Sequence, residues 1–177
     1  KTVASSGGAS SHYAGEKFGF EQATTDVDRV FEDPTINTVI VATRHNTHAD
    51  FVCRALEAGK HVFVEKPLAL DEAGLERIDE TYRRVSEERG DVPLLMVGFN
   101  RRFSPHVKRI EELLGQKAEP PTFIMTGNAG EIPADHWTQD PAVGGGRIIG
   151  EGCHFIDLLR HLADSPISRI ESLQMGS

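Results

Sequence analysis

The chain has 177 residues, and its 19 Lys and Arg against 27 Asp and Glu give a formal net charge of −8. This acidic balance argues against nucleic-acid binding, which needs clustered basic side chains to neutralise phosphates. The longest apolar stretches are a few residues long, far below the ~20 that span a bilayer, so we expect no membrane segment.

The first residues predict two short helices, over 10–18 and 26–31. The chain opens with Lys1 rather than Met, and its beginning resembles the middle of a domain. We therefore expect a fragment of a longer protein.

Strands and helices alternate from residue 38 to residue 98. The β-branched run Thr38–Ala42 predicts a strand buried on both faces, as in a parallel sheet. A helix follows with apolar positions from Ala49 to Leu56, and Gly59 is its stop signal. The other expected elements are a strand at His61–Val64, a helix from an Asp71 N-cap to Val85, and a strand at Leu94–Gly98. This alternation is typical of βαβ crossovers and predicts an α/β fold with a doubly wound parallel sheet.

The pattern changes after Gly98. Ser104-Pro105 predicts the start of a helix that ends at Gly115. Beyond it we expect a strand at 122–126, an irregular glycine-rich segment at 127–146, a helix over 155–162 and a strand at 167–175. We place a domain boundary near Asn100, so that residues 1–100 and 101–177 form two domains.

A polar cluster follows each of the three strands predicted between residues 38 and 98. The clusters are residues 43–48, Glu65-Lys66-Pro67 and Asn100-Arg101-Arg102. Because the carboxyl ends of parallel strands share one edge, where open α/β sheets bind their ligands, we expect these clusters to meet. One polar loop is ordinary, but three in succession favour a ligand site.

Lys66 and His154 are the main candidates for chemistry. Lys66 follows a buried strand, where partial desolvation favours proton transfer, although an ordinary surface lysine in a turn is the alternative. His154 follows a glycine-dense segment at the start of a predicted helix, which disfavours imidazolium and suits a neutral base; the alternative is a structural histidine. Asp157, one turn further, either orients His154 or complements the helix dipole.

Several known motifs do not occur in the sequence. It contains no G-x-G-x-x-G, no phosphate-binding P-loop and no serine-hydrolase elbow. His45-x-x-His48 and Cys153-His154 lack a second ligand pair at a zinc spacing, so we predict no metal site. Cys53 and Cys153 are too few for a disulfide framework and fit a reducing, cytoplasmic compartment; a single pair between them is the alternative that the count leaves open.

Four motifs occur in a characteristic order along the chain. They are Val39-Ile40-Val41-Ala42-Thr43 running into His48, residues 57–69 with Glu65-Lys66-Pro67, Gly98-Phe99-Asn100-Arg101-Arg102-Phe103, and Gly-x-His-x-x-Asp at Gly152, His154 and Asp157. In this order and spacing, the chain resembles the Gfo/Idh/MocA oxidoreductases, which include glucose-fructose oxidoreductase and inositol dehydrogenase. The Glu-Lys-Pro element is the most specific of the four.

The resemblance implies a Rossmann-type domain that binds NAD or NADP, followed by a substrate domain with an open, mainly antiparallel sheet that often builds the oligomer. The implied reaction is hydride transfer between nicotinamide and a hydroxyl or keto carbon of a sugar or nucleotide-sugar. The implied catalytic residues are Lys66 and the acid/base His154, and Pro67 is expected to follow a cis peptide. The implied cofactor-binding residues are Thr43, His48, Glu65, Lys66, Pro67, Asn100 and Arg101. The implied substrate-binding residues are Lys66, Trp137, Arg147, Glu151 and His154.

Residues 129–138 resemble a narrower branch, the bi-domain oxidoreductases of bacterial polysaccharide gene clusters, in which a zinc-type alcohol dehydrogenase-like region precedes this module. The chain also departs from the family pattern. Gly150 stands where many members carry an acidic residue, so either Glu151 substitutes for it or His154 lacks its usual partner. Arg44-His45 replaces a common Pro-Asn pair. Residues 1–4 would be the tail of the second strand, so that the first strand and glycine loop, roughly 30 residues, are expected to lie upstream.

Two other functions stay open from the sequence. The same site suits a non-oxidative sugar enzyme that recycles its NAD, and the change at Gly150 keeps open a non-catalytic nucleotide-binding or assembly module. The expected partners are a sugar-like small molecule and further copies of the chain through the C-terminal sheet, with no nucleic acid and no membrane.

Overall fold

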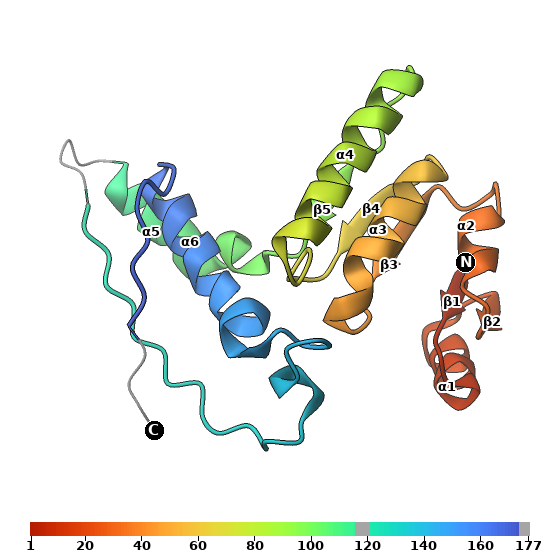
Figure 1. The fold of residues 1–177 in the computed structure, drawn as a ribbon, viewed down its shortest axis with the longest axis horizontal. Coiled ribbons are helices and arrows are strands. Elements are labelled where there is room, and N and C mark those ends of the chain that lie inside the picture. Colours follow the sequence, from red (N-terminus) through yellow and green to blue (C-terminus); the bar gives the residue numbers. More distant parts are fainter. Residues whose placement is uncertain (116–120, 174–177) are drawn as a thin grey trace.

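The computed structural model describes residues 1–115 and 121–173. Figure 1 shows three groups of elements along the long axis of the molecule. A two-stranded sheet with its helices lies at the N-terminal end, a three-stranded sheet with two helices lies in the middle, and the last two α-helices lie at the other end. None of the helices in the described residues is long and apolar enough to cross a membrane.

The N-terminal group is a small parallel unit. Its elements are β1 (Thr2–Ala4), α1 (Gly8–Phe18), β2 (Gln22–Thr24) and α2 (Asp28–Glu32). β1 pairs in parallel with β2, with Val3 opposite Ala23. The two predicted helices are confirmed, whereas β2 was not predicted, because three residues are too few to show a strand periodicity.

The middle group is a parallel sheet in the order β3-β4-β5, which confirms the predicted order of strands and helices. Its elements are β3 (Thr38–Val41), α3 (His48–Glu57), β4 (His61–Val64), α4 (Glu72–Glu88) and β5 (Leu95–Val97). Gly59 follows α3 with a φ of +70°, a left-handed conformation that suits glycine. The carboxylate of Asp71 accepts a hydrogen bond from the Gly74 N–H at 2.8 Å and caps α4.

The core lies on one face of this sheet, where α3 packs against β3 and β4 and α4 packs against α3 and adds Ile78 to the core. Val41 and Val64 point toward the helices and meet Val52 and Leu56, both of which are completely buried. The opposite face is open in the described residues, since Ile40 remains 71% exposed. The prediction that Thr38–Ala42 is buried on both faces is therefore wrong: its side chains alternate between the core and the open face.

The C-terminal part is helical or irregular wherever the structure describes it. Its elements are the 3-10 turn η2 (Asn100–Phe103), α5 (Pro105–Leu114), the 3-10 turn η3 (Trp137–Gln139), the π-helical turn η4 (Ile148–Gly152) and α6 (Cys153–Ala163). The predicted helices here are confirmed, and Ser104 caps α5 by accepting a hydrogen bond from the Val107 N–H.

The two strands predicted in this part are wrong for the residues that the structure describes. Residues 122–126 and 167–173 have no regular structure, and the last residues of the second prediction lie outside the described ranges. Strand geometry requires a hydrogen-bonded neighbour, and none of the described residues supplies one. Ile124 is accordingly 92% exposed.

Candidate functional site

The loops that follow β4 and β5 lie against each other at the carboxyl edge of the sheet. The backbone ladder continues past the strands, with Glu65 N–H donating to the Val41 carbonyl and Gly98 N–H to the Val64 carbonyl, both at 2.8 Å. A Cβ placed on Gly98 would lie 3.3 Å from the carboxyl carbon of Glu65. A glycine at this position thus lets the Asn100 segment pass close to the Glu65-Lys66-Pro67 turn.

Lys66 reaches from this turn to the far end of the chain. Its Nζ donates a hydrogen bond to the carbonyl of Gly150 at 2.6 Å, across a sequence separation of 84 residues. The peptide between Lys66 and Pro67 is cis, as the resemblance led us to expect. The ammonium therefore lies beside η4, the turn that leads directly into His154.

His154 is buried at the start of α6, with 9% of its surface exposed. Burial lowers the pKa of its imidazole, and the charges of Lys66 and Arg101 lower it further. The ring is therefore neutral near pH 7, the form that can accept a proton. Its Nδ1 is buried without a hydrogen-bond partner among the described residues.

Glu151 does not act as the partner of His154. Its carboxylate lies 3.6 Å from the guanidinium of Arg101, which also lies over the ring of Phe155 at 4.3 Å. Of the two alternatives raised by Gly150, the structure favours a histidine without an acidic partner.

Asp157 neither contacts His154 nor simply complements the helix dipole. It forms a two-bond ion pair with Arg102, in which Arg102 Nε donates to Oδ2 at 2.7 Å and a terminal nitrogen donates to Oδ1. The carboxylate raises the pKa of the Arg102 guanidinium, and the Asp157 side chain is only 8% exposed. This pair ties α6, which carries His154, to η2, which carries Arg101.

His48 lies inside the protein rather than on the surface of the site. It is completely buried, with Nδ1 2.7 Å from the Pro67 carbonyl and Nε2 3.1 Å from the Thr43 carbonyl. The ring thus bridges the loops after β3 and β4. The Thr43 side chain is exposed, and its hydroxyl shares a hydrogen bond of 2.6 Å with Thr47.

Trp137 and Arg147 come from the irregular segment and its continuation. The indole ring of Trp137 packs edge-on against the ring of His45, with centroids 4.9 Å apart. Arg147 donates to the carbonyls of Gly130 and Ala129 at 2.8 and 3.0 Å. Arg147 therefore holds the 129–130 loop, while Trp137 faces the loop after β3.

His45 appeared in the sequence analysis only as a member of the 43–48 cluster, a rejected metal ligand and a departure from the family pattern, with no role assigned to it. It is buried, and its Nδ1 lies 2.8 Å from the Gly144 carbonyl, 99 residues away in the sequence. Its place directly after a strand was the available signal. Its hydrogen-bond partner could not be identified from the sequence, because that partner is the backbone carbonyl of Gly144 rather than a side chain.

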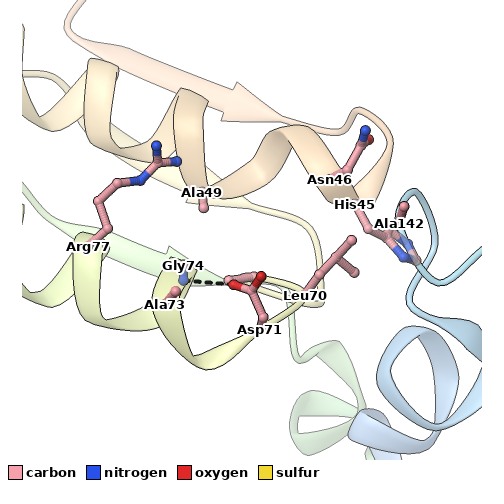
Figure 2. Close-up of a pocket in the computed structure, with 10 residues that line it drawn as sticks. His45, Asn46, Ala49, Leu70, Asp71, Ala73, Gly74, Arg77 and Ala142 are labelled. Carbon is pink, nitrogen blue, oxygen red and sulfur yellow. Dashed lines mark hydrogen bonds between the residues drawn. The ribbon is translucent and has the colours of Figure 1, made fainter.

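A cavity of about 360 Å³ lies beside His45, between α3 and the beginning of α4. Figure 2 shows the His45 ring at one end, close to Ala142, with Leu70 on the same side and Arg77 at the far end. The cavity wall near His45 thus combines the loop after β3 with the segment that follows Trp137.

The residues gathered here suit the nicotinamide end of the cofactor that the resemblance implies. The buried Nδ1 of His154 has no hydrogen-bond partner among the described residues, so the site retains a polar group that a ligand can engage. Lys66 supplies a cation and Thr43 a hydroxyl at the carboxyl edge of a parallel sheet, where such ligands bind. Among the described residues, no group of three or more side chains has the arrangement of a metal site.

A comparison with protein-family models matches residues 1–90 to the Gfo/Idh/MocA oxidoreductase family with an NAD-binding Rossmann fold. Among curated proteins, the chain is 32% identical to myo-inositol 2-dehydrogenase of Thermotoga maritima over 158 residues, which cover 88% of this chain and 44% of that protein. It is 33% identical to the NAD⁺-dependent scyllo-inositol 2-dehydrogenase of Bacillus subtilis, covering 87% of this chain and 43% of that protein.

Solved structures give the same picture of the fold. A levoglucosan dehydrogenase in complex with NADH and levoglucosan matches with a TM-score of 0.74 and 26% identity, over 92% of this chain and 44% of that one. A probable dehydrogenase from Thermotoga maritima matches with a TM-score of 0.73 and 26% identity, over 94% of this chain and 48% of that one. The chain thus spans less than half the length of these relatives.

Proposed function

The chain belongs to the Gfo/Idh/MocA oxidoreductase family, with its NAD-binding Rossmann fold, and we propose that it is part of an NAD(P)-dependent dehydrogenase acting on a sugar, polyol or nucleotide-sugar. The observation that carries the proposal is the meeting of Lys66 with the turn before His154, through the bond from Lys66 Nζ to the Gly150 carbonyl. This contact brings a cation and a neutral buried imidazole into one site. The names of the relatives, dehydrogenases of inositols and levoglucosan, support the substrate class.

We propose that residues 1–100 form the cofactor domain without its first strand and glycine loop, and that residues 101–177 form part of a substrate domain. In the complete, longer protein, this second domain would contain an open, mainly antiparallel sheet that also builds a homo-oligomer. The exposed apolar side chains of Ile124 and Ile170 support a further partner surface there. On the resemblance of residues 129–138, we assign the protein to the bi-domain branch, and we propose a cytoplasmic location.

The cofactor-binding residues divide into two groups by their burial. Thr43 is exposed, and Glu65 and Lys66 are partly exposed at the sheet edge, so they would contact the nicotinamide end directly, with Asn100 and Arg101 at its border. His48 and Pro67 are buried, so they would act by holding the two loops in place. When bound, NAD(P) supplies the nicotinamide carbon that accepts the hydride.

The chain's own residues would handle the proton and the charge. Lys66 donates a hydrogen bond to the substrate oxygen and stabilises the alkoxide character that develops as hydride leaves. His154, kept neutral by burial, accepts the hydroxyl proton at a ring nitrogen. Glu151 and Arg147, at η4, line the path by which the substrate reaches Lys66 and His154. Trp137, from the irregular segment, closes the other side of this path. Carbinol oxidation requires both the base and the cation, since the proton must leave as the hydride does.

The test is single-turnover hydride transfer in the complete enzyme, followed by nicotinamide absorbance with inositols and anhydro-sugars as substrates. We expect Lys66→Ala to slow hydride transfer by about 100-fold or more, as for removal of a positioned charge-stabilising group. Lys108→Ala, an exposed lysine on α5, is the matched control and should keep the wild-type rate. An unchanged rate in Lys66→Ala would overturn the proposal.

The same assay separates the other two functions. Turnover of substrate without net reduction of the cofactor would identify a non-oxidative enzyme that recycles its NAD. Full biological activity after replacing both Lys66 and His154 would identify a non-catalytic module.

A further inference from the structure

The ring of His45 occupies a fixed place between two loops that are distant in the sequence. It lies edge-on to both Trp137 and His48, with ring centroids 4.9 and 5.6 Å away. Because a carbonyl oxygen can only accept, the 2.8 Å contact with Gly144 means that His45 Nδ1 carries a proton and donates it. The loop after β3 is thereby fastened to the glycine-rich turn before η4, beside Ala142 in Figure 2.

The same ring fills the space where a side chain at position 150 would lie. A Cβ built on Gly150 would come within 3.1 Å of His45 Cε1 and 3.3 Å of the Gly144 carbonyl oxygen. Either distance is shorter than ordinary van der Waals contact, so a methyl group fits only if a neighbour moves. The His45 ring therefore occupies the space beside Gly150, and Gly150 itself is buried.

The Gly150 carbonyl is the atom that accepts the hydrogen bond from Lys66 Nζ, at 2.6 Å. A continuous series of contacts thus runs from Gly144 through His45 to Gly150 and on to Lys66. We propose that His45 is the positioning residue for Lys66: it anchors the Gly144 turn and supports Gly150, so that the Gly150 carbonyl holds the Lys66 ammonium in place. This inference rests on the proposed function, because it concerns the geometry of the same site.

The charge state of His45 agrees with this role. Burial lowers the pKa of its imidazole, and the nearby His48 and Lys66 lower it further, against the opposing effect of the bond to Gly144. A neutral ring can support Gly150 without placing a second positive charge near the Lys66 ammonium.

The decisive measurement is a double-mutant cycle between His45 and Lys66, read by single-turnover hydride transfer in the complete enzyme. His45→Asn keeps a donor close to the place of Nδ1 but removes Cε1, the ring atom that would lie nearest to a Cβ at position 150. We expect it to slow hydride transfer by about 10- to 100-fold, since a displacement of about 1 Å can have an effect of that size. In the Lys66→Ala background, the same substitution should have almost no further effect.

Gly150→Ala provides a second test of the same contact. The added methyl group should also slow hydride transfer, and His45→Asn in the same chain should restore part of the rate by freeing space. His61→Asn is the matched control, because it alters a histidine whose Nδ1 accepts from the Leu94 N–H at 3.0 Å on β4, outside the site.

Equal effects of His45→Asn with and without Lys66, or no rescue of Gly150→Ala, would overturn the inference and leave the proposed function intact. A wild-type rate in Lys66→Ala alone would instead overturn the proposed function. The two failures are therefore distinguishable within one set of variants.

Discussion

Removing the Arg102 guanidinium should destabilise the complete protein more than removing the charge of its partner, Asp157. The two side chains form a two-bond ion pair between η2 and α6, but they differ in their access to water. The Asp157 side chain is 8% exposed, whereas that of Arg102 is 31% exposed. Arg102→Met therefore leaves a buried carboxylate without a partner, while Asp157→Asn leaves a cation that water can reach.

The expected losses follow from this asymmetry. Breaking a buried ion pair by removing one partner costs about 3–5 kcal/mol, and the partial exposure of Arg102 reduces this to about 2–3 kcal/mol for Arg102→Met. In Asp157→Asn the amide oxygen still accepts one of the two hydrogen bonds, so the loss should be about 1 kcal/mol. Arg109→Met is the control, because the exposed pair of Arg109 with Glu112 should contribute less than about 0.5 kcal/mol.

The measurement is urea unfolding of the complete protein. The free energies of unfolding in water are compared between variants whose slope of free energy against urea concentration is unchanged. Equal losses for the two substitutions, or a larger loss for Asp157→Asn, would refute the reasoning from burial. A loss below that of Arg109→Met would show that the pair does not hold α6 against η2.

Two further predictions concern the core and the acid limb of activity. Leu56→Ala should destabilise the protein by about 2–5 kcal/mol in urea unfolding, because Leu56 is completely buried, and Leu75→Ala, 46% exposed, should cost much less. The lowered pKa of His154 places the acid limb of hydride transfer below the usual histidine value, because the rate falls as the ring is protonated. Arg101→Gln removes a charge that lowers this pKa and should move the limb to higher pH. Glu151→Gln removes a charge that raises it and should move the limb to lower pH; shifts in the same direction would contradict this electrostatic account.

The fold of the middle sheet could be predicted because its signals are local. The β-branched runs, the Asp71 cap and Gly59 each determine a strand, a helix start or a helix end within a few residues. Which elements pack on the two faces of a strand is not determined by the residues of the strand itself. Thr38–Ala42 has the composition of a strand buried on both faces, yet Ile40 lies on the open face in the described structure. The strand predicted at 122–126 failed for the same reason, since its neighbour would have to come from elsewhere.

The sequence proposes the residues of the candidate site, but it predicts only some of their contacts. Lys66 and the turn before His154 do meet, as the family resemblance led us to expect. The contact of Asp157 differed from both alternatives, because Asp157 pairs with Arg102. His154 has an unpartnered Nδ1, which was one of the two alternatives left open by Gly150. Which of several carboxylates a histidine meets depends on the relative rotation of helices, and the sequence does not contain that information in readable form.

The two departures from the family pattern gain a physical meaning only when they are taken together. Taken alone, Gly150 indicates only that a side chain is missing at that position. Taken alone, His45 indicates only a changed loop sequence. In the folded chain the His45 ring lies 3.1 Å from where a Cβ at position 150 would be, so a larger residue at one position requires a smaller one at the other. The absence of an acidic side chain beside His154 is therefore coupled to a ring that takes up its space and to a backbone carbonyl that holds Lys66. An acidic residue restored at position 150 would consequently impair the site unless His45 were made smaller in the same chain.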